Sequence, residues 1–251
     1  MGGMTGSLLL LLLAGVSVST MVDLQKRIIN GHDCNNNERQ YHVQLQIQKP
    51  TALSDFCGGS LIGNQWILTA AHCWQPGWLI TAILRVHPRG NEVNVPIHMN
   101  NIHKEGTADI MLLKLPAPAN GVHQIALPDC VRHPLPRNVM VQIAGHGSTT
   151  AGPGGTRTPG MVQHLKCANI RAVDCPRFNQ NLYQRKFCGA TTDRNNPVGG
   201  CLGDSGGGVV YNNRIYGVIS GVHPTHVCTG PDNYEGVCGS MQWIENTMRN
   251  N

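Results

Sequence analysis

A serine set among glycines stands at Ser205, in the stretch 199–208 that reads GGCLGDSGGG. Glycine adopts backbone conformations that other residues avoid, so such a turn brings a hydroxyl and neighbouring backbone N–H groups close to one substrate carbonyl. We therefore predict that Ser205 is a nucleophile and that the N–H groups of Gly203 and Ser205 form an oxyanion hole. Taken alone, the same stretch also fits a simple tight turn, so the prediction depends on the rest of the chain.

Two segments upstream supply the partners that a serine nucleophile needs. His72 stands in TAAHC (69–73), and Asp109 stands in ADIMLLKL (108–115). A serine hydroxyl is a poor nucleophile until a histidine accepts its proton, and that histidine needs a carboxylate to fix its tautomer. The order His, Asp, Ser differs from the orders found in subtilisins and α/β-hydrolases. With these three motifs, the chain resembles the chymotrypsin-like (trypsin-type) serine endopeptidases.

The resemblance implies an all-β fold of two packed antiparallel six-stranded β-barrels with a C-terminal helix. The sequence agrees with this fold, because Val43, Leu45 and Ile47 alternate with polar residues as in a half-buried strand. Further short strands are predicted at 67–69, 110–115, 139–143 and 215–220, and the residues Met241, Ile244 and Met248 recur at helical spacing. The proline-rich span 116–136 is predicted to connect the barrels. The active site is then expected between them.

The resemblance also implies an inactive precursor. In the family, cleavage after a basic residue frees an Ile or Val amine that pairs with the Asp before the catalytic serine, which identifies Arg27, Ile28 and Asp204 here. A buried carboxylate without a partner is unfavourable, so the new ammonium group would hold the turn around Ser205 in its working shape. The alternative is that Arg27 is a chance basic residue in a flexible tail.

The substrate pocket is the region that departs most from trypsin. The residue six positions before the serine is an Asp in trypsin-type enzymes that prefer Arg or Lys at P1, but it is Gly199 here. The stretch 231–238 matches the family's pocket wall and puts Asp232 where that wall has Gly, similar to some broad-specificity crustacean collagenolytic members. A desolvated carboxylate gains most from a cation, which predicts a basic P1 preference. The alternative is a small or medium apolar preference, with Asp232 facing solvent and Val222 narrowing the pocket as in elastases. Ser220 completes the predicted substrate-binding residues.

The chain begins with a segment that is typical of a secretory leader. Residues 8–13 are all leucine, a run too short to cross a bilayer, and small residues follow up to a cleavage site near Thr20. A membrane anchor is the alternative interpretation. We predict a signal peptide over 1–19, an activation propeptide over 20–27 and a protease domain over 28–251, with barrels over roughly 28–135 and 136–238. The expected location is secreted, either extracellular or in a secretory granule.

Ten cysteines behind such a leader indicate a disulfide framework made in an oxidising compartment. The sequence alone does not pair them. The resemblance implies the bridges Cys34–Cys167, Cys57–Cys73, Cys130–Cys238, Cys175–Cys188 and Cys201–Cys228. The family's further bridge, from the strand before the autolysis loop to the strand after the serine, is missing at both ends, where Val141 and Tyr211 stand.

No metal or other cofactor is predicted. The cysteines form no CxxC pair, which argues against zinc. Glu92 is the only acid between residues 74 and 101, which argues against the family's calcium loop. The formal net charge of +5 is spread thinly, with no run of Lys and Arg longer than two, so neither nucleic acid nor a membrane is expected as a partner.

The resulting prediction is a monomeric serine endopeptidase. Its expected partners are protein or peptide substrates, an activating trypsin-like protease and protein protease inhibitors. The alternative is a catalytically inactive homologue that serves as a binding protein, because Gly221 stands where the family usually has a Trp beside the substrate. The presence of Ser205, His72 and Asp109 together favours the enzyme.

Overall fold

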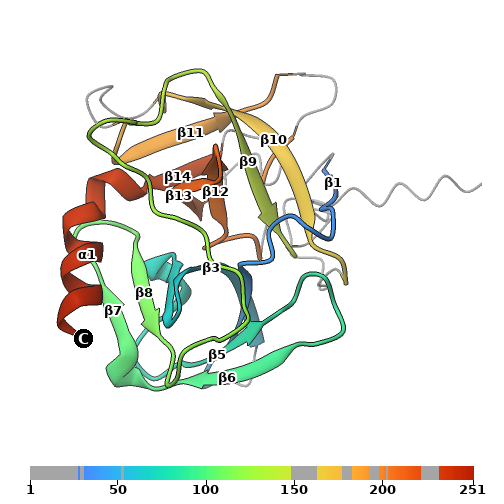
Figure 1. Cartoon of the computed structure of the whole chain (residues 1–251), viewed down its shortest axis with the longest axis vertical. Helices are drawn as coiled ribbons and strands as arrows, with labels where there is room; N and C mark the ends of the chain where they lie inside the picture. The colour runs from blue at the N-terminus through green and yellow to red at the C-terminus, as the bar shows by residue number, and fades with distance from the viewer. Residues whose placement is uncertain are drawn as a thin grey trace, which may run out of the picture.

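Two curled antiparallel sheets and a short C-terminal helix make up the fold (Figure 1). The structure is a computed structural model, and it describes residues 28, 31–51, 54–147, 163–176, 183–192, 198–201, 203–221 and 232–251. In these residues the predicted all-β class is confirmed. The first sheet is built from the first half of the chain, and most of the second sheet is built from the second half.

The first sheet has the strand order β6-β5-β2-β3-β4-β8-β7. The predicted alternation is confirmed in β2, where Val43, Leu45 and Ile47 are buried while Gln46 and Gln48 are exposed. Within the described residues this sheet has seven strands instead of six, because a short 3-10 helix, η2 (Met99–Asn101), divides the segment 93–104 into β6 and β7. The strands are β2 (His42–Gln48), β3 (Ser54–Gly63), β4 (Trp66–Thr69), β5 (Leu79–Leu84), β6 (Val93–Ile97), β7 (Ile102–Lys104) and β8 (Met111–Lys114).

The second sheet closes into a six-stranded barrel, because β10 pairs with both β11 and β9 in the order β10-β11-β14-β13-β12-β9. A seventh strand, β1, adds to its outside by pairing with β10. Residues 32–33 therefore belong to the second sheet, although they lie before the first one in the sequence. The strands are β1 (His32–Asp33), β9 (Met140–Gly145), β10 (Lys166–Val173), β11 (Lys186–Ala190), β12 (Gly208–Tyr211), β13 (Arg214–Gly221) and β14 (Asp232–Gly236).

The predicted C-terminal helix is α1 (Met241–Asn250), which follows the 3-10 helix η5 (Val237–Ser240). Figure 1 shows α1 beside the first sheet, close to β7 and β8. Ile244 is fully buried in the first core, and Met241, Trp243 and Met248 pack against the same core. The helix therefore ties the end of the chain to the first sheet.

Four of the predicted disulfides are present in the structure: Cys34–Cys167, Cys57–Cys73, Cys130–Cys238 and Cys175–Cys188. Cys201 is also disulfide-bonded, and its predicted partner Cys228 lies outside the described residues. Two of these bridges tie distant parts of the chain together, across 133 and 108 residues. Closing such long loops restricts the unfolded chain, which stabilises the fold.

A buried arginine joins β9 to β12, the two strands between which the family's further disulfide is missing. Arg39 donates from Nε to Gln142 Oε1 at 2.8 Å, from Nη2 to Gln142 O at 2.5 Å, and from Nη1 to Gly208 O at 2.9 Å. Its exposed fraction is 4%. Gly208 lies three residues after Ser205, so this contact also fixes the segment that follows the predicted nucleophile.

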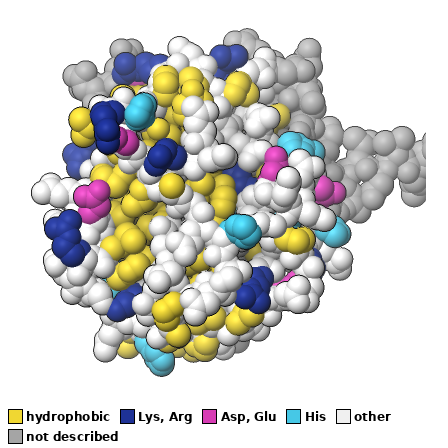
Figure 2. All heavy atoms as spheres, in the orientation of Figure 1, with side chains coloured by type: hydrophobic (Ala, Val, Ile, Leu, Met, Phe, Trp, Pro, Cys, Tyr) yellow, Lys and Arg dark blue, Asp and Glu magenta, His cyan; other side chains and the backbone are white. Residues whose placement is uncertain are grey.

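The surface shows no concentration of charge on the face drawn in Figure 2. Lys and Arg side chains are spread over this face, between hydrophobic and uncharged polar groups. In the part of the chain that the structure describes, no helix is both long enough and apolar enough to cross a membrane.

Candidate active site

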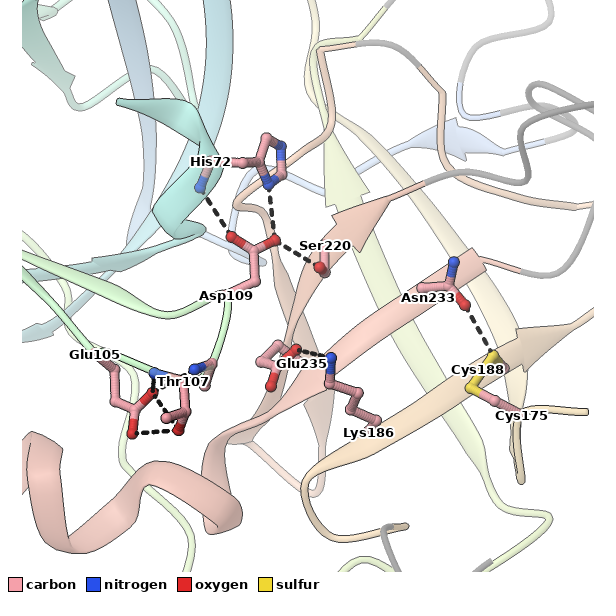
Figure 3. Close-up of polar contacts among 11 residues, drawn as sticks. His72, Glu105, Thr107, Asp109, Cys175, Lys186, Cys188, Ser220, Asn233 and Glu235 are labelled. Atoms are coloured by element: carbon pink, nitrogen blue, oxygen red, sulfur yellow. Dashed lines mark hydrogen bonds and ion pairs between the residues drawn. A yellow bond between two sulfur atoms is a disulfide. The ribbon is translucent and has the colours of Figure 1, made fainter. Parts of the chain in front are cut away.

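The first sheet brings His72 and Asp109 together. His72 lies in the 3-10 helix η1 (Ala71–Cys73) just after β4, and Asp109 lies just before β8. Because β4 and β8 are antiparallel neighbours, with Thr69 opposite Met111, the end of one strand meets the start of the other. The His72 ring Nδ1 lies 2.7 Å from Asp109 Oδ2, and the His72 backbone N–H donates to Asp109 Oδ1 at 2.8 Å (Figure 3).

The carboxylate of Asp109 is held by a third donor from the second barrel. Ser220, on β13, donates its hydroxyl to Asp109 Oδ2 at 2.5 Å. Burial by itself raises the pKa of Asp109, but the hydrogen bond and charge of the His72 ring, with the donors from Ser220 and the His72 backbone, bring the pKa below its usual value. Ser220 is one of the predicted substrate-binding residues, and in the structure its hydroxyl supports Asp109.

The loop before Asp109 is anchored by Glu105, which the sequence analysis did not single out. Its Oε2 accepts hydrogen bonds from the backbone N–H of Thr107 at 2.8 Å and from that of Ala108. The Thr107 hydroxyl also donates to this carboxylate at 3.2 Å (Figure 3). An acid two to three residues before these N–H groups is the signal of such a side-chain turn.

The turn around Ser205 is tied to the first barrel. The backbone N–H of Gly58, on β3, donates to Ser205 O at 2.7 Å. Cys57 is bridged to Cys73, whose Sγ lies 3.9 Å from the same oxygen. The residues next to His72 and the backbone of Ser205 are therefore held at one place, where the two barrels meet. Among the described residues no hydrogen bond joins Ser205 Oγ to His72 Nε2, a contact that is often long in protease structures without substrate.

The glycines beside Ser205 are needed for the shape of this turn. Gly203 has φ +100° and Gly206 has φ +83°, both in the region that favours glycine. A Cβ on Gly206 would lie 2.3 Å from Gly58 O, so the close approach of the barrels also requires glycine. Within the described part of the chain, the N–H groups of Gly203 and Ser205 make no hydrogen bond. Both donors are thus free to bind an oxyanion.

Asp204 is fully buried next to the predicted nucleophile. Its Oδ1 accepts from the Gly147 N–H at 2.7 Å, and its Oδ2 accepts from the Cys201 N–H at 2.8 Å. Burial raises the pKa of Asp204 to about 6, against the lowering effect of these two donors. Ile28 is buried in the core of the same barrel, with 1% exposure. Arg27, the predicted cleavage site, lies outside the described residues.

Asp232 lies in the interior of the second barrel at the start of β14. Its Oδ2 accepts from the Gly200 N–H at 2.6 Å and from the Tyr234 hydroxyl at 3.2 Å. Its Oδ1 is buried without a hydrogen-bond partner among the described residues. Burial raises the pKa of Asp232 to about 7. The expectation of a solvent-facing Asp232 is therefore wrong for this structure. Gly199 is also buried. Val222 is not among the described residues.

Among the described residues, one group of side chains has its potential metal-ligand atoms within 4.8 Å of one another: Cys57, His72 and Cys73. The two sulfur atoms are joined in a disulfide, so they offer no thiolate to a metal. Glu92, the acid of the shortened loop, pairs with Arg89 at 3.0 Å.

Comparisons with known proteins agree with this geometry. The family model described as Trypsin matches residues 28–244. Anionic trypsin of Canis lupus familiaris is 29% identical over 97% of this chain and 98% of its own length. Kallikrein-11 of Mus musculus is 31% identical over 97% of this chain and 90% of its own length. A solved structure of HL collagenase is 25% identical with a TM-score of 0.71, covering 89% of this chain and 99% of the other. The two-barrel fold and the match over most of its length show that this chain belongs to the trypsin family, whose members hydrolyse peptide bonds.

Proposed function

We propose that the chain is a secreted serine endopeptidase, made as a precursor, that hydrolyses peptide bonds through an acyl-enzyme on Ser205. The observation that carries the proposal is the pair of contacts between His72 and Asp109, next to a serine turn with two free N–H groups. Secretion is supported by the leucine-rich leader and by the disulfides. The expected partners are peptide or protein substrates, an activating protease and protein inhibitors.

The mechanism follows from the orientation of the His72 ring. With Nδ1 bonded to Asp109, Nε2 is left to accept the proton of Ser205 Oγ while the oxygen attacks the substrate carbonyl carbon. The carbonyl oxygen becomes negative and accepts hydrogen bonds from the N–H groups of Gly203 and Ser205. His72 then gives its proton to the leaving amine, and the acyl group stays on Ser205. A water molecule then gives a proton to His72, attacks the acyl carbon and releases the acyl group from Ser205.

Activation is proposed to depend on Asp204. Cleavage after Arg27 gives Ile28 a charged amine, and this amine is proposed to pair with the Asp204 carboxylate. Two observations support the pair: the burial of Ile28 in the second barrel, and the raised pKa of Asp204, which marks a carboxylate that would gain from a cation. A Cβ on Gly145 or Gly147 would overlap Asp204, so these glycines leave the room in which the carboxylate lies.

For the P1 preference we propose Arg and Lys, recognised by Asp232. The support is the buried Oδ1 without a partner among the described residues, together with the absence of a side chain on Gly199 and Gly200. A substrate cation would neutralise this carboxylate. The alternative remains a small or medium apolar P1 preference. A library of peptides varied at P1 separates the two, because the alternative predicts no cleavage after Arg or Lys.

The test of the catalytic proposal is hydrolysis of such peptides by the protein cut after Arg27. We expect Ser205→Ala and His72→Ala each to lower kcat by about 10⁴-fold or more, with the fold unchanged by circular dichroism. His98→Ala, at an exposed histidine, serves as the matched control. Near-normal turnover by Ser205→Ala would exclude the mechanism. An inactive wild type would instead support the alternative, a homologue that acts only as a binding protein.

A further inference from the structure

A second buried carboxylate lies behind the triad. Glu235, on β14, has an exposed fraction of only 3%. It stands directly opposite Lys186 of β11 in the register of the two strands, and Lys186 Nζ lies 3.6 Å from Glu235 Oε2. Figure 3 shows Glu235 between Lys186 and the loop that carries Asp109. The sequence analysis gave this acid no role.

The strand register brings Glu235 close to the contacts of Asp109. Its other neighbour across the sheet is Val218 of β13, two residues before Ser220, whose hydroxyl donates to Asp109. Asp109 is near enough for its charge to act on the carboxylate of Glu235. Burial raises the pKa of Glu235, Lys186 lowers it, and the Asp109 charge raises it further. Lys186, Glu235 and Asp109 therefore form one group of interacting charges.

The two members of the ion pair are unequally exposed. The side chain of Lys186 is 38% exposed, whereas that of Glu235 is 4% exposed. Water screens an exposed charge much more than a buried one, so Lys186 offsets the field of Glu235 only in part. A negative field from Glu235 therefore remains at Asp109.

We propose that Glu235 is a positioning residue for the triad, which places a second negative charge behind the Asp109–His72 pair. This inference rests on the proposed function. Glu235 does not touch the substrate or the reacting atoms. It acts through the charge of Asp109, by stabilising the imidazolium that forms when Ser205 gives up its proton.

The other charges near this group are few in the described segments. Lys186 and Asp109 act on Glu235, and His72 acts on Asp109. Glu105, at the far end of the Asp109 loop, is under the influence of Arg185. None of the variants used below alters Glu105 or Arg185, so their contribution is the same in every protein compared.

The first test is the dependence of kcat/KM on pH in Glu235→Gln, which keeps the size of the side chain but removes its charge. Without that charge the imidazole loses its proton at lower pH. The pH of half-maximal kcat/KM on the acid side should therefore fall by about 0.3–1 pH unit, with the plateau changed less than about threefold. Glu235→Ala should show the same shift, because it removes the same charge.

Glu245→Gln, at an exposed acid of α1, is the matched control and should leave the profile unchanged. A purely structural role would lower the plateau or the stability without moving the acid side of the profile. A Glu235→Gln profile that superimposes on that of the wild type would overturn the proposal.

The second test does not need catalysis. The NMR signal of the His72 ring is followed against pH in Ser205→Ala, with and without Glu235→Gln. We expect the midpoint of this titration to move to lower pH when Glu235 is replaced, and an unmoved midpoint would overturn the inference. If the proposed function is wrong, the result is different: the wild-type protein cleaves no peptide, although the midpoint of the His72 titration still moves.

Discussion

Three carboxylates near the candidate active site differ in what surrounds them. Asp109, where the barrels meet, is bonded to the His72 ring, the His72 backbone and the Ser220 hydroxyl, and its pKa is lowered. Asp204 and Asp232, inside the second barrel, are bonded to backbone N–H groups and one phenol, and burial raises their pKa values to about 6 and about 7.

The difference separates a carboxylate that already has a cationic partner from two that have none in the described part of the chain. The triad carboxylate already has a partner that can carry a positive charge. The two carboxylates of the second barrel have none among the described residues, so each would gain free energy from a cation brought from elsewhere. In our proposal the Ile28 amine supplies one cation after cleavage, and the substrate side chain supplies the other.

The largest expected effect is that of Asp204→Asn in the cut protein. The substitution removes the charge that the Ile28 amine would pair with, and a buried pair broken in this way costs about 3–5 kcal/mol. We expect kcat/KM to fall by about 100-fold or more. Asp129→Asn, at an acid that forms an ion pair with Arg132 on the surface, should change it less than about twofold. Full activity of Asp204→Asn would show that the buried Asp204 carboxylate does not need a cationic partner.

The next effect concerns Asp232→Asn. If Asp232 recognises a cation, the ratio of kcat/KM for Arg or Lys over Leu at P1 should fall by about 10- to 100-fold, because the interaction between opposite charges is lost. The measurement is the peptide library described above, applied to both proteins. An unchanged P1 profile in the variant would show that Asp232 does not determine the P1 preference.

A third prediction uses the raised pKa of Asp232, about 7 in the folded protein. The unfolded chain loses this proton near pH 4 and the folded protein keeps it, so this group makes stability decrease as pH rises from about 4 to about 7. Asp232→Asn cannot ionise at this position, so it does not lose stability in this way as pH rises. Its free energy of unfolding relative to wild type should therefore increase by roughly 2–4 kcal/mol between pH 4 and pH 8, measured by urea unfolding. Parallel curves for the two proteins would contradict a desolvated carboxyl at this position.

The smallest effect tests the buried cation of the same barrel. In the described part of the chain, the hydrogen bonds of Arg39 go to neutral oxygens of Gln142 and Gly208. Arg39→Ala leaves buried carbonyl groups unpaired and should lower the free energy of unfolding by about 2 kcal/mol. Arg171→Ala, at an exposed arginine, should lower it by less than about 0.5 kcal/mol. Equal stability of Arg39→Ala and wild type would show that β9 and β12 do not depend on this link.

The sequence allowed the two-barrel fold and the C-terminal helix to be predicted, because local alternation and short motifs carry that information. The segments that carry His72, Asp109 and Ser205 were singled out for the same reason, and their catalytic roles stay a prediction. Glu235 could not be found in this way, because its neighbours Lys186 and Asp109 are remote in the sequence and meet only through strand pairing. Arg39 is similar, since it reaches residues more than 100 positions away. Ser220 was recognised, but its contact with Asp109 crosses from one barrel to the other.

The central claim is that Ser205 becomes a nucleophile when the chain is cut after Arg27. The most direct measurement is labelling with a fluorophosphonate, followed by mass spectrometry to locate the label and by sequencing of the new N-terminus. We predict rapid labelling of Ser205 in the wild-type protein cut to begin at Ile28, and slow labelling in Arg27→Gln treated with the same trypsin-like protease. A cut wild-type protein that takes no label at Ser205 would contradict the account.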